Sequence, residues 1–193
     1  MTQREKIIEV TTSLINENQG DVTKVTARKI SERAEVGLGL INYHFGSKDQ
    51  LVTECVQKIV SEQIRVFSPS GTPDAEPSIQ KDKQRLADWA KQVFEFLYMN
   101  KNIISISILG DLRNNAALSN SAYTQMGLEQ AIQSSIDDRK KKQMIFTLAS
   151  TMQCAFLQDN LAKSRLGFDF ANKQDREQYI ESLVDMLFEG VCV

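Results

Sequence analysis

Hydrophobic side chains recur three and four positions apart along most of this 193-residue chain, which is the spacing of one face of an α-helix. The sequence has little sustained alternation and no Asn-Gly or Asp-Gly pair, so signals for strands and hairpins are weak. All three prolines, Pro69, Pro73 and Pro77, fall in one short segment. The pattern therefore predicts an all-α fold interrupted by one mobile loop over residues 68–80.

The first part of the chain predicts four helices, beginning with one over about residues 4–18. Two short helices follow, over about residues 26–35 and 37–45, and a tight glycine-containing turn joins them. Two short helices connected in this way form a helix-turn-helix. A connecting helix over about residues 47–67 would be about 30 Å long at about 1.5 Å per residue. That length is enough to link an N-terminal domain of residues 1–50 to a second domain.

The third predicted helix has an outer face suited to nucleic acid. Ile41 and Phe45 point inward, which leaves outward Leu38, Gly39, Leu40, Asn42, Tyr43 and His44. An asparagine amide pairs with adenine, leucines contact thymine methyl groups, and tyrosine and histidine donate to phosphates. Lys48, at the start of the next helix, adds a phosphate clamp. The alternative is the ordinary surface of a small bundle, because basic and acidic residues number seven each over residues 1–51.

Three strings of residues sharpen this hypothesis: TARKI at 26–30, AEV at 34–36 and GLINYHFGSKDQL at 39–51. They closely resemble the DNA-binding domain of the tetracycline-repressor (TetR/AcrR) family, over about residues 4–52. The resemblance implies that the third helix lies in the major groove. It implies base contacts by Leu38, Leu40, Asn42 and Arg28, and phosphate contacts by Thr26, Tyr43, His44 and Lys48. Family members often have serine and threonine where Gly37 and Leu40 stand here, so readout is expected to depend on methyl contacts and Asn42.

Residues 81–193 predict a second, C-terminal helical domain for ligand binding and dimerisation. Residues 102–112 fit either a short buried strand or a helix that is apolar all round, and we predict a helix because no partner strand is in sight. The other expected helices cover residues 81–100, 119–137, about 140–165 and 174–190.

Apolar side chains with a few polar points in this domain predict a cavity for an apolar or amphipathic small-molecule effector. Between Phe94 and Leu109 only Glu95 and Lys101 carry a charge at neutral pH. The candidate lining is Trp89, Phe94, Tyr98, Ser105, Ser107, Met126, Met152 and Phe156. The alternative is ordinary core packing, with the serines bonded back to helix carbonyls.

The last two predicted helices carry apolar faces wider than one intramolecular contact uses, which favours pairing with a second copy. The candidate interface is Met152, Phe156, Ile180, Leu183, Val184 and Leu187. A buried core explains the same stripes. The TetR resemblance agrees with pairing, because the dimers of that family form a four-helix bundle from their last two long helices. It also implies a homodimeric, ligand-responsive regulator, a repressor that a small molecule releases from a palindromic operator.

Composition excludes several other classes. Lys plus Arg number 23 and Asp plus Glu number 25, so the net charge of −2 requires any attraction to DNA to be local. Cys55, Cys154 and Cys192 lie far apart without metal-ligand or CxxC spacing, which predicts free thiols in a reducing cytoplasm. No stretch approaches the roughly 18 apolar residues of a membrane span. A cytoplasmic protein is expected.

An enzyme is not expected, because the single histidine, His44, has no orienting carboxylate motif and the chain has no P-loop or nucleophile elbow. Neither a metal nor a cofactor is expected. Two alternatives to the ligand-responsive regulator stay open: a helix-turn-helix adaptor that binds protein rather than DNA, and a regulator that senses oxidants through Cys192.

Overall fold

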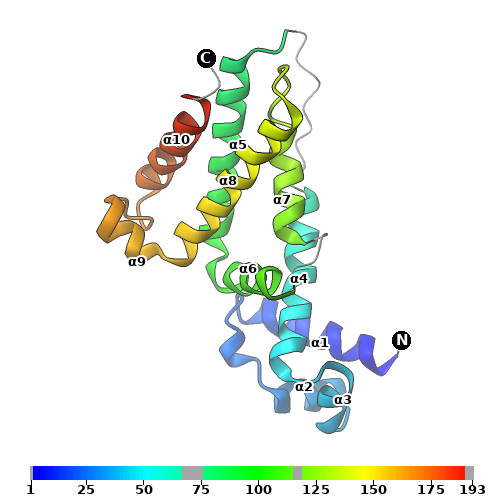
Figure 1. Cartoon of the computed structure of the whole chain (residues 1–193). Coiled ribbons are helices and arrows are strands. Elements are labelled where there is room, and N and C mark those ends of the chain that lie inside the picture. The colour runs from blue at the N-terminus through cyan, green and yellow to red at the C-terminus, as the bar shows by residue number, and fades with distance from the viewer. Residues whose placement is uncertain (1, 67–75, 115–118, 190–193) are drawn as a thin grey trace. The chain divides into compact units, whose positions relative to one another are not determined.

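The computed structural model describes residues 2–66, 76–114 and 119–189, and all regular structure in these residues is helical (Figure 1). The all-α prediction is therefore confirmed. Part of the expected loop and Cys192 lie outside the described residues. The backbone divides into two compact units. Unit 1 contains Met1–Val66 and Asn100–Ala116, and unit 2 contains Phe67–Met99 and Ala117–Val193.

Unit 1 consists of five α-helices and one short 3₁₀ turn, η1, within its described residues. Its elements are α1 (Gln3–Glu17), η1 (Val22–Lys24), α2 (Ala27–Ala34), α3 (Gly39–Phe45), α4 (Lys48–Val66) and α6 (Lys101–Asn114). The first four α-helices begin and end within about two residues of the predicted limits. The fully buried apolar side chains of unit 1 include Ile7, Ile15, Ile30, Ile41 and Leu51 on these four helices and Ile104 on α6.

Local hydrogen bonds define the ends of α1. The Glu5 amide donates to the Thr2 hydroxyl over 3.2 Å, and the Thr2 amide donates to the Glu5 carboxylate over 2.8 Å. These two bonds form the capping box, which satisfies free amides at the start of the helix. After α1, Gly20 takes a φ of 79°, a left-handed conformation that glycine adopts without steric cost.

Residues 102–112, which fit either a strand or a helix by sequence, lie in the helix α6, as predicted. α6 belongs to unit 1, although the sequence predicts it as part of the C-terminal domain of residues 81–193. A Cβ built on its Gly110 would lie 2.9 Å from Nε2 of Gln57 on α4, so glycine permits this close approach. Gln57 Nε2 donates to the Ser107 carbonyl over 3.0 Å and to the Asp111 carboxylate over 2.8 Å. The Ser107 hydroxyl donates to Gln57 Oε1 over 3.1 Å. We call Gln57, Ser107 and Asp111 the α4–α6 clamp.

Unit 2 is also helical throughout its described residues. Its elements are α5 (Ile79–Met99), α7 (Asn120–Glu129), α8 (Asp138–Leu157), α9 (Asp159–Leu161), the π-helical turn η2 (Ala162–Leu166) and α10 (Lys173–Glu189). α5 packs against α7, α8 and α10. The helix predicted to run to about residue 165 ends at Leu157, and α9 and η2 replace its last two turns. No helix in the described part of the chain is long and apolar enough to cross a bilayer.

α7 is shorter than the predicted helix over residues 119–137. It ends at Glu129, and the following turn is bonded to the fully buried Asp82 of α5. The Asp82 carboxylate accepts from the amides of Gln133 over 3.0 Å and Ser134 over 2.9 Å. These amides are then unavailable for helical bonds, so a buried carboxylate distant in sequence decides where the helix ends.

A second buried charge fixes α10 against α5. The Arg176 side chain donates to the two carboxylate oxygens of Glu95 over 2.8 and 2.9 Å and to the Phe170 carbonyl over 2.6 Å. Its guanidinium carbon lies 4.3 Å from the ring centroid of Tyr98. Arg176 is only 4% exposed, and a charge so deeply buried is stable only with such a set of partners.

Candidate nucleic-acid interface

α2, α3 and the turn between them form the predicted helix-turn-helix. The Thr26 hydroxyl accepts from the Lys29 amide over 3.2 Å, so α2 begins where the sequence predicts. After α2, Glu35 takes a left-handed conformation with a φ of 53°, which turns the chain toward α3. Ile30 of α2 and Ile41 of α3 are buried in the core of unit 1. The opposite side of α3 is thereby directed to solvent.

We call the outer surface of α3 and its N-cap residue the reading face; its members are Leu38, Gly39, Asn42 and Tyr43, all exposed. Leu38 is 55% exposed and Tyr43 is 81% exposed. A Cβ added at Gly39 would meet no atom within 4 Å, so the backbone at the start of α3 is open. The reading face offers one side-chain amide, one phenol and one apolar side chain to a bound molecule.

Leu40 and His44 flank the reading face and are half-buried. The rings of His44 and Tyr43 meet edge to face with 5.0 Å between their centroids. The Nε2 atom of His44 is buried and has no hydrogen-bond partner among the described residues. From Val36 to Ser47 the sequence contains no Asp, Glu, Lys or Arg. The surface of α3 is therefore free of formal charge apart from the imidazole.

The cations predicted to contact DNA come from the neighbouring helices. Arg28 on α2 donates from Nε to the Glu32 carboxylate over 2.8 Å, a bond that raises the pKa of Arg28. Lys48 at the start of α4 lies 3.0 Å from the carboxylate of Asp49. Each cation thus has a carboxylate neighbour at the surface, and each has further N–H donors that the bond with this neighbour does not use. The structure places the predicted DNA-binding residues within unit 1.

The N-terminus of α4 is capped by a side chain. The Ser47 hydroxyl accepts from the Gln50 amide over 3.1 Å. Gly46 ends α3 with a φ of 77°, and this left-handed conformation separates α3 from α4. Lys48 is thereby fixed next to the end of α3.

The predicted ligand-binding residues fall into both units. Ser105 and Ser107 lie on α6 in unit 1, and the other six lie in unit 2. The Ser105 hydroxyl donates to the Lys101 carbonyl over 2.8 Å, which is the bond to a helix carbonyl that the core-packing alternative expects. The Ser107 hydroxyl belongs to the α4–α6 clamp. Both hydroxyls already have partners within unit 1.

Within unit 2 the remaining ligand candidates differ in exposure. Phe94, Met152 and Phe156 are core residues, each at most 3% exposed. Trp89 and Tyr98 are half-buried, and Met126 is 48% exposed on α7. The three aromatic candidates on α5 therefore differ: Phe94 is a core residue, whereas Trp89 and Tyr98 are partly accessible. Helical periodicity alone does not distinguish the two kinds.

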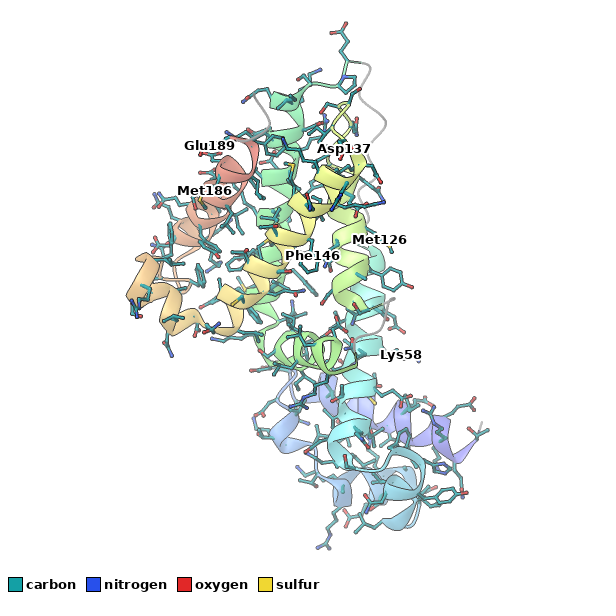
Figure 2. The ribbon with its side chains drawn as sticks, in the orientation of Figure 1. Lys58, Met126, Asp137, Phe146, Met186 and Glu189 are labelled. Atoms are coloured by element: carbon teal, nitrogen blue, oxygen red, sulfur yellow. The ribbon has the colours of Figure 1, made fainter. Side chains whose placement is uncertain are left out.

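Most of the predicted dimer-interface residues belong to the core of unit 2. Met152, Phe156, Ile180 and Val184 are each at most 3% exposed, so they are unavailable to a partner in this conformation. Leu183 and Leu187 are half-buried. The large apolar side chains that α8 and α10 do expose are Phe146, 61% exposed, and Met186, 59% exposed, both labelled in Figure 2. Helical periodicity does not point to these two residues, because they lie off the dominant apolar stripes.

The two described cysteines differ in environment. Cys55 is buried in unit 1, where desolvation raises the pKa of its thiol to about 11. A thiol with such a pKa is almost entirely protonated near neutral pH and therefore weakly nucleophilic. Cys154 is exposed on α8. In the described ranges no three His, Cys, Asp or Glu side chains are grouped so that they could hold a metal ion.

Comparison with known proteins agrees with this geometry. The model of the family described as "Bacterial regulatory proteins, tetR family" matches residues 7–55. A solved TetR transcriptional regulator from Rhodococcus sp. RHA1 is 13% identical, with a TM-score of 0.58 and coverage of 96% of this chain and 94% of that chain. At this identity the likeness concerns the fold.

A second structure, of a TetR-like transcriptional regulator from the same organism, is 12% identical with a TM-score of 0.45, over 98% of this chain and 96% of that one. No curated protein matches the chain. The segment matched by the family model runs from α1 into α4 and includes the whole helix-turn-helix and its reading face.

Proposed function

The chain belongs, through residues 7–55, to the tetR family of bacterial regulatory proteins, and from this premise we propose that it represses transcription as an operator-binding homodimer. The observation that carries the proposal is the reading face, an open helix surface without formal charge that presents Asn42 beside Leu38. Hydrogen-bonding amides and apolar side chains are among the groups that distinguish base edges in the major groove. A regulator of this kind acts where the DNA is, in the cytoplasm.

The proposed contacts divide into two kinds. Leu38, Leu40 and Asn42 meet base edges and set the sequence preference, with Arg28 beside them on α2. The phosphate contacts come from Thr26, Tyr43, His44 and Lys48, and these set the position of α3 in the groove without carrying sequence information. Gly39 lets the backbone approach the DNA closely because no side chain stands in the way.

Dimerisation is proposed through α8 and α10. The sequence from Gln143 to Gln158 on α8 contains no charged residue, although much of its outer side is exposed. Phe146 on α8 and Met186 on α10 are large exposed apolar side chains. Exposed apolar surface that lacks charge favours association, and a second copy of the chain is the partner that a two-fold operator requires.

A homodimer explains how DNA binding is regulated. Two copies of α3 must lie about one turn of DNA apart, roughly 34–36 Å, to enter successive major grooves. We propose that an apolar or amphipathic effector binds unit 2 and prefers a state of the dimer in which the two copies of α3 have a different spacing. Such an effector lowers operator affinity, and the size of the effect is set by the difference between its affinities for the two states. Release by such a small molecule makes the protein a ligand-responsive repressor.

The effector proposal has an optical test, because Trp89 is the only tryptophan and is half-buried on α5. Small apolar molecules that raise the thermal stability of the protein would be titrated while Trp89 fluorescence and operator affinity are followed. Both signals are expected to change with one midpoint, since a single coupling free energy links the two sites. A stabilising molecule that changes neither signal contradicts this placement of the effector.

The function itself is tested by selection of duplexes from a random library with the full-length protein. We expect one enriched sequence with two-fold symmetry, bound at least about 10³-fold more tightly than random duplex at physiological salt. Failure to enrich any sequence would contradict the proposal and favour an adaptor that binds protein.

A further inference from the structure

We propose that the reading face selects A·T base pairs, with the Leu38 side chain against a thymine methyl group and the Asn42 amide on a neighbouring adenine. The inference rests on the proposed DNA-binding function and specifies which bases that function reads. Leu38 and Asn42 are four residues apart and both exposed, so they are neighbours along the axis of α3. They would therefore meet adjacent base pairs.

The exposed side chains of the reading face have the chemistry that A·T pairs require. In the major groove, guanine is read mainly by arginine or lysine, and cytosine by a carboxylate that accepts from its amino group. The chain from Val36 to Ser47 contains no arginine, lysine, aspartate or glutamate. Adenine instead pairs with an asparagine or glutamine amide, and thymine offers a methyl group to an apolar side chain. Asn42 and Leu38 therefore match adenine and thymine, and they match neither guanine nor cytosine.

The surface around Leu38 has a shape that suits contact with a methyl group. Leu38 is 55% exposed. The next residue, Gly39, adds no side chain, and a Cβ there would meet nothing within 4 Å. The leucine therefore projects from an open backbone, next to a residue that has no side chain. Apolar contact with a methyl group is the specific interaction that such a side chain can make with DNA.

One nearby cation competes with this assignment. Arg28 is 87% exposed on α2, and a guanidinium reads guanine when two of its donors meet O6 and N7. Its Nε already donates to the Glu32 carboxylate over 2.8 Å, one helical turn away. That bond leaves the two terminal nitrogens of the guanidinium to other acceptors, but Arg28 lies on α2, whereas Leu38 and Asn42 are exposed side chains of the reading face itself. The structure thus favours A·T pairs under α3.

The test uses the duplex selected by the full-length protein, in which each half-site thymine is replaced in turn by deoxyuridine. This substitution removes only the methyl group. At the thymine under Leu38, the wild-type protein is expected to bind the deoxyuridine duplex about three- to fivefold more weakly, which corresponds to one buried methyl group. The Leu38→Ala variant is expected to bind both duplexes equally. Leu112→Ala, which changes a 69% exposed leucine on α6, serves as the matched control and should discriminate as the wild type does.

Two results separate this inference from the function beneath it. Specific binding to half-sites with G·C pairs under α3, or specific binding that no deoxyuridine substitution weakens, overturns the A·T assignment and leaves the proposed regulator intact. Selection that enriches no sequence overturns the regulator, and the A·T assignment with it. Leu38 lies at the surface, so loss of the methyl effect in Leu38→Ala will not reflect a misfolded protein.

Discussion

At the scale of single residues, Asn42 and Lys48 should have separable effects on DNA binding. Asn42→Ala is expected to lower affinity for the selected operator by about 5- to 150-fold, the equivalent of about 1–3 kcal/mol for a bidentate base contact. Its affinity for random duplex should hardly change. Lys48→Ala should instead weaken all duplexes alike and reduce the salt slope of binding by about one unit, because it removes one phosphate contact. Competitive binding at two salt concentrations measures both effects.

Other results would contradict the base contact proposed for Asn42 or the phosphate contact proposed for Lys48. Equal loss of operator and random binding in Asn42→Ala would show that its amide does not read a base. An unchanged salt slope in Lys48→Ala would indicate that the ion pair with Asp49, at 3.0 Å, persists in the complex.

Single residues also show how far sequence reasoning reaches. Thr26 and Ser47 cap the two helices whose starts the sequence predicts, because each hydroxyl accepts from an amide only three residues away. The inward direction of Ile41 and Phe45 follows from helical periodicity alone. The proposed interface residue Val184 is buried instead, because periodicity shows that a face is covered and does not show which surface covers it.

At the scale of elements, the contact between α4 and α6 should depend on the absence of a side chain at Gly110. Gly110→Ala would place a Cβ 2.9 Å from Gln57 Nε2 and 3.0 Å from Thr53 Cγ2, and is expected to lower the free energy of unfolding by about 1–2 kcal/mol. Gly127→Ala on α7, where the Cβ meets no atom within 4 Å, should raise it by about 0.5–1 kcal/mol. Urea unfolding of the two variants measures the difference.

Comparison of Gly110→Ala with Gly127→Ala shows which result would contradict this prediction. If Gly110→Ala stabilises the protein as much as Gly127→Ala, helix propensity alone acts at both positions. α6 would then lack the close contact with α4 that the α4–α6 clamp requires. The two variants make the same chemical change in a helix, so their difference reports only on the surroundings.

Element boundaries were predictable where the decisive contacts are local. α1 to α4 follow their caps and glycines, all within a few residues of each end. α7 ends eight residues before the predicted limit of 137 because Asp82, some fifty positions earlier, binds the following turn. The assignment of α6 to unit 1 likewise depends on Gln57, fifty residues before Ser107. Sequence periodicity carries no information about such pairings.

At the scale of the whole molecule, self-association is expected to depend on the exposed apolar residues of α8 and α10. Met186→Glu should weaken the proposed dimer at least about tenfold, because a charge buried at an interface without a partner costs more than the 1.4 kcal/mol that a factor of ten represents. Met126→Glu is the matched control, since Met126 is 48% exposed on α7 of the same unit. Sedimentation velocity across a concentration series measures both variants.

Circular dichroism should be unchanged in both variants, because both methionines are exposed. A Met186→Glu protein that sediments as the wild type would move the interface away from α10. A similar loss of association in Met126→Glu would extend the interface to α7. Operator affinity should fall together with dimerisation, because a half-site bound alone loses the contribution of its linked partner.

The central claim is that two copies of α3 read successive major grooves of one operator, and hydroxyl-radical footprinting of the selected duplex tests it most directly. We expect two protected patches related by two-fold symmetry, with centres about 10 base pairs apart, or a whole number of helical turns. The bases under the reading face should lie within these patches. A single unpaired patch, or uniform weak protection along the duplex, would contradict the claim.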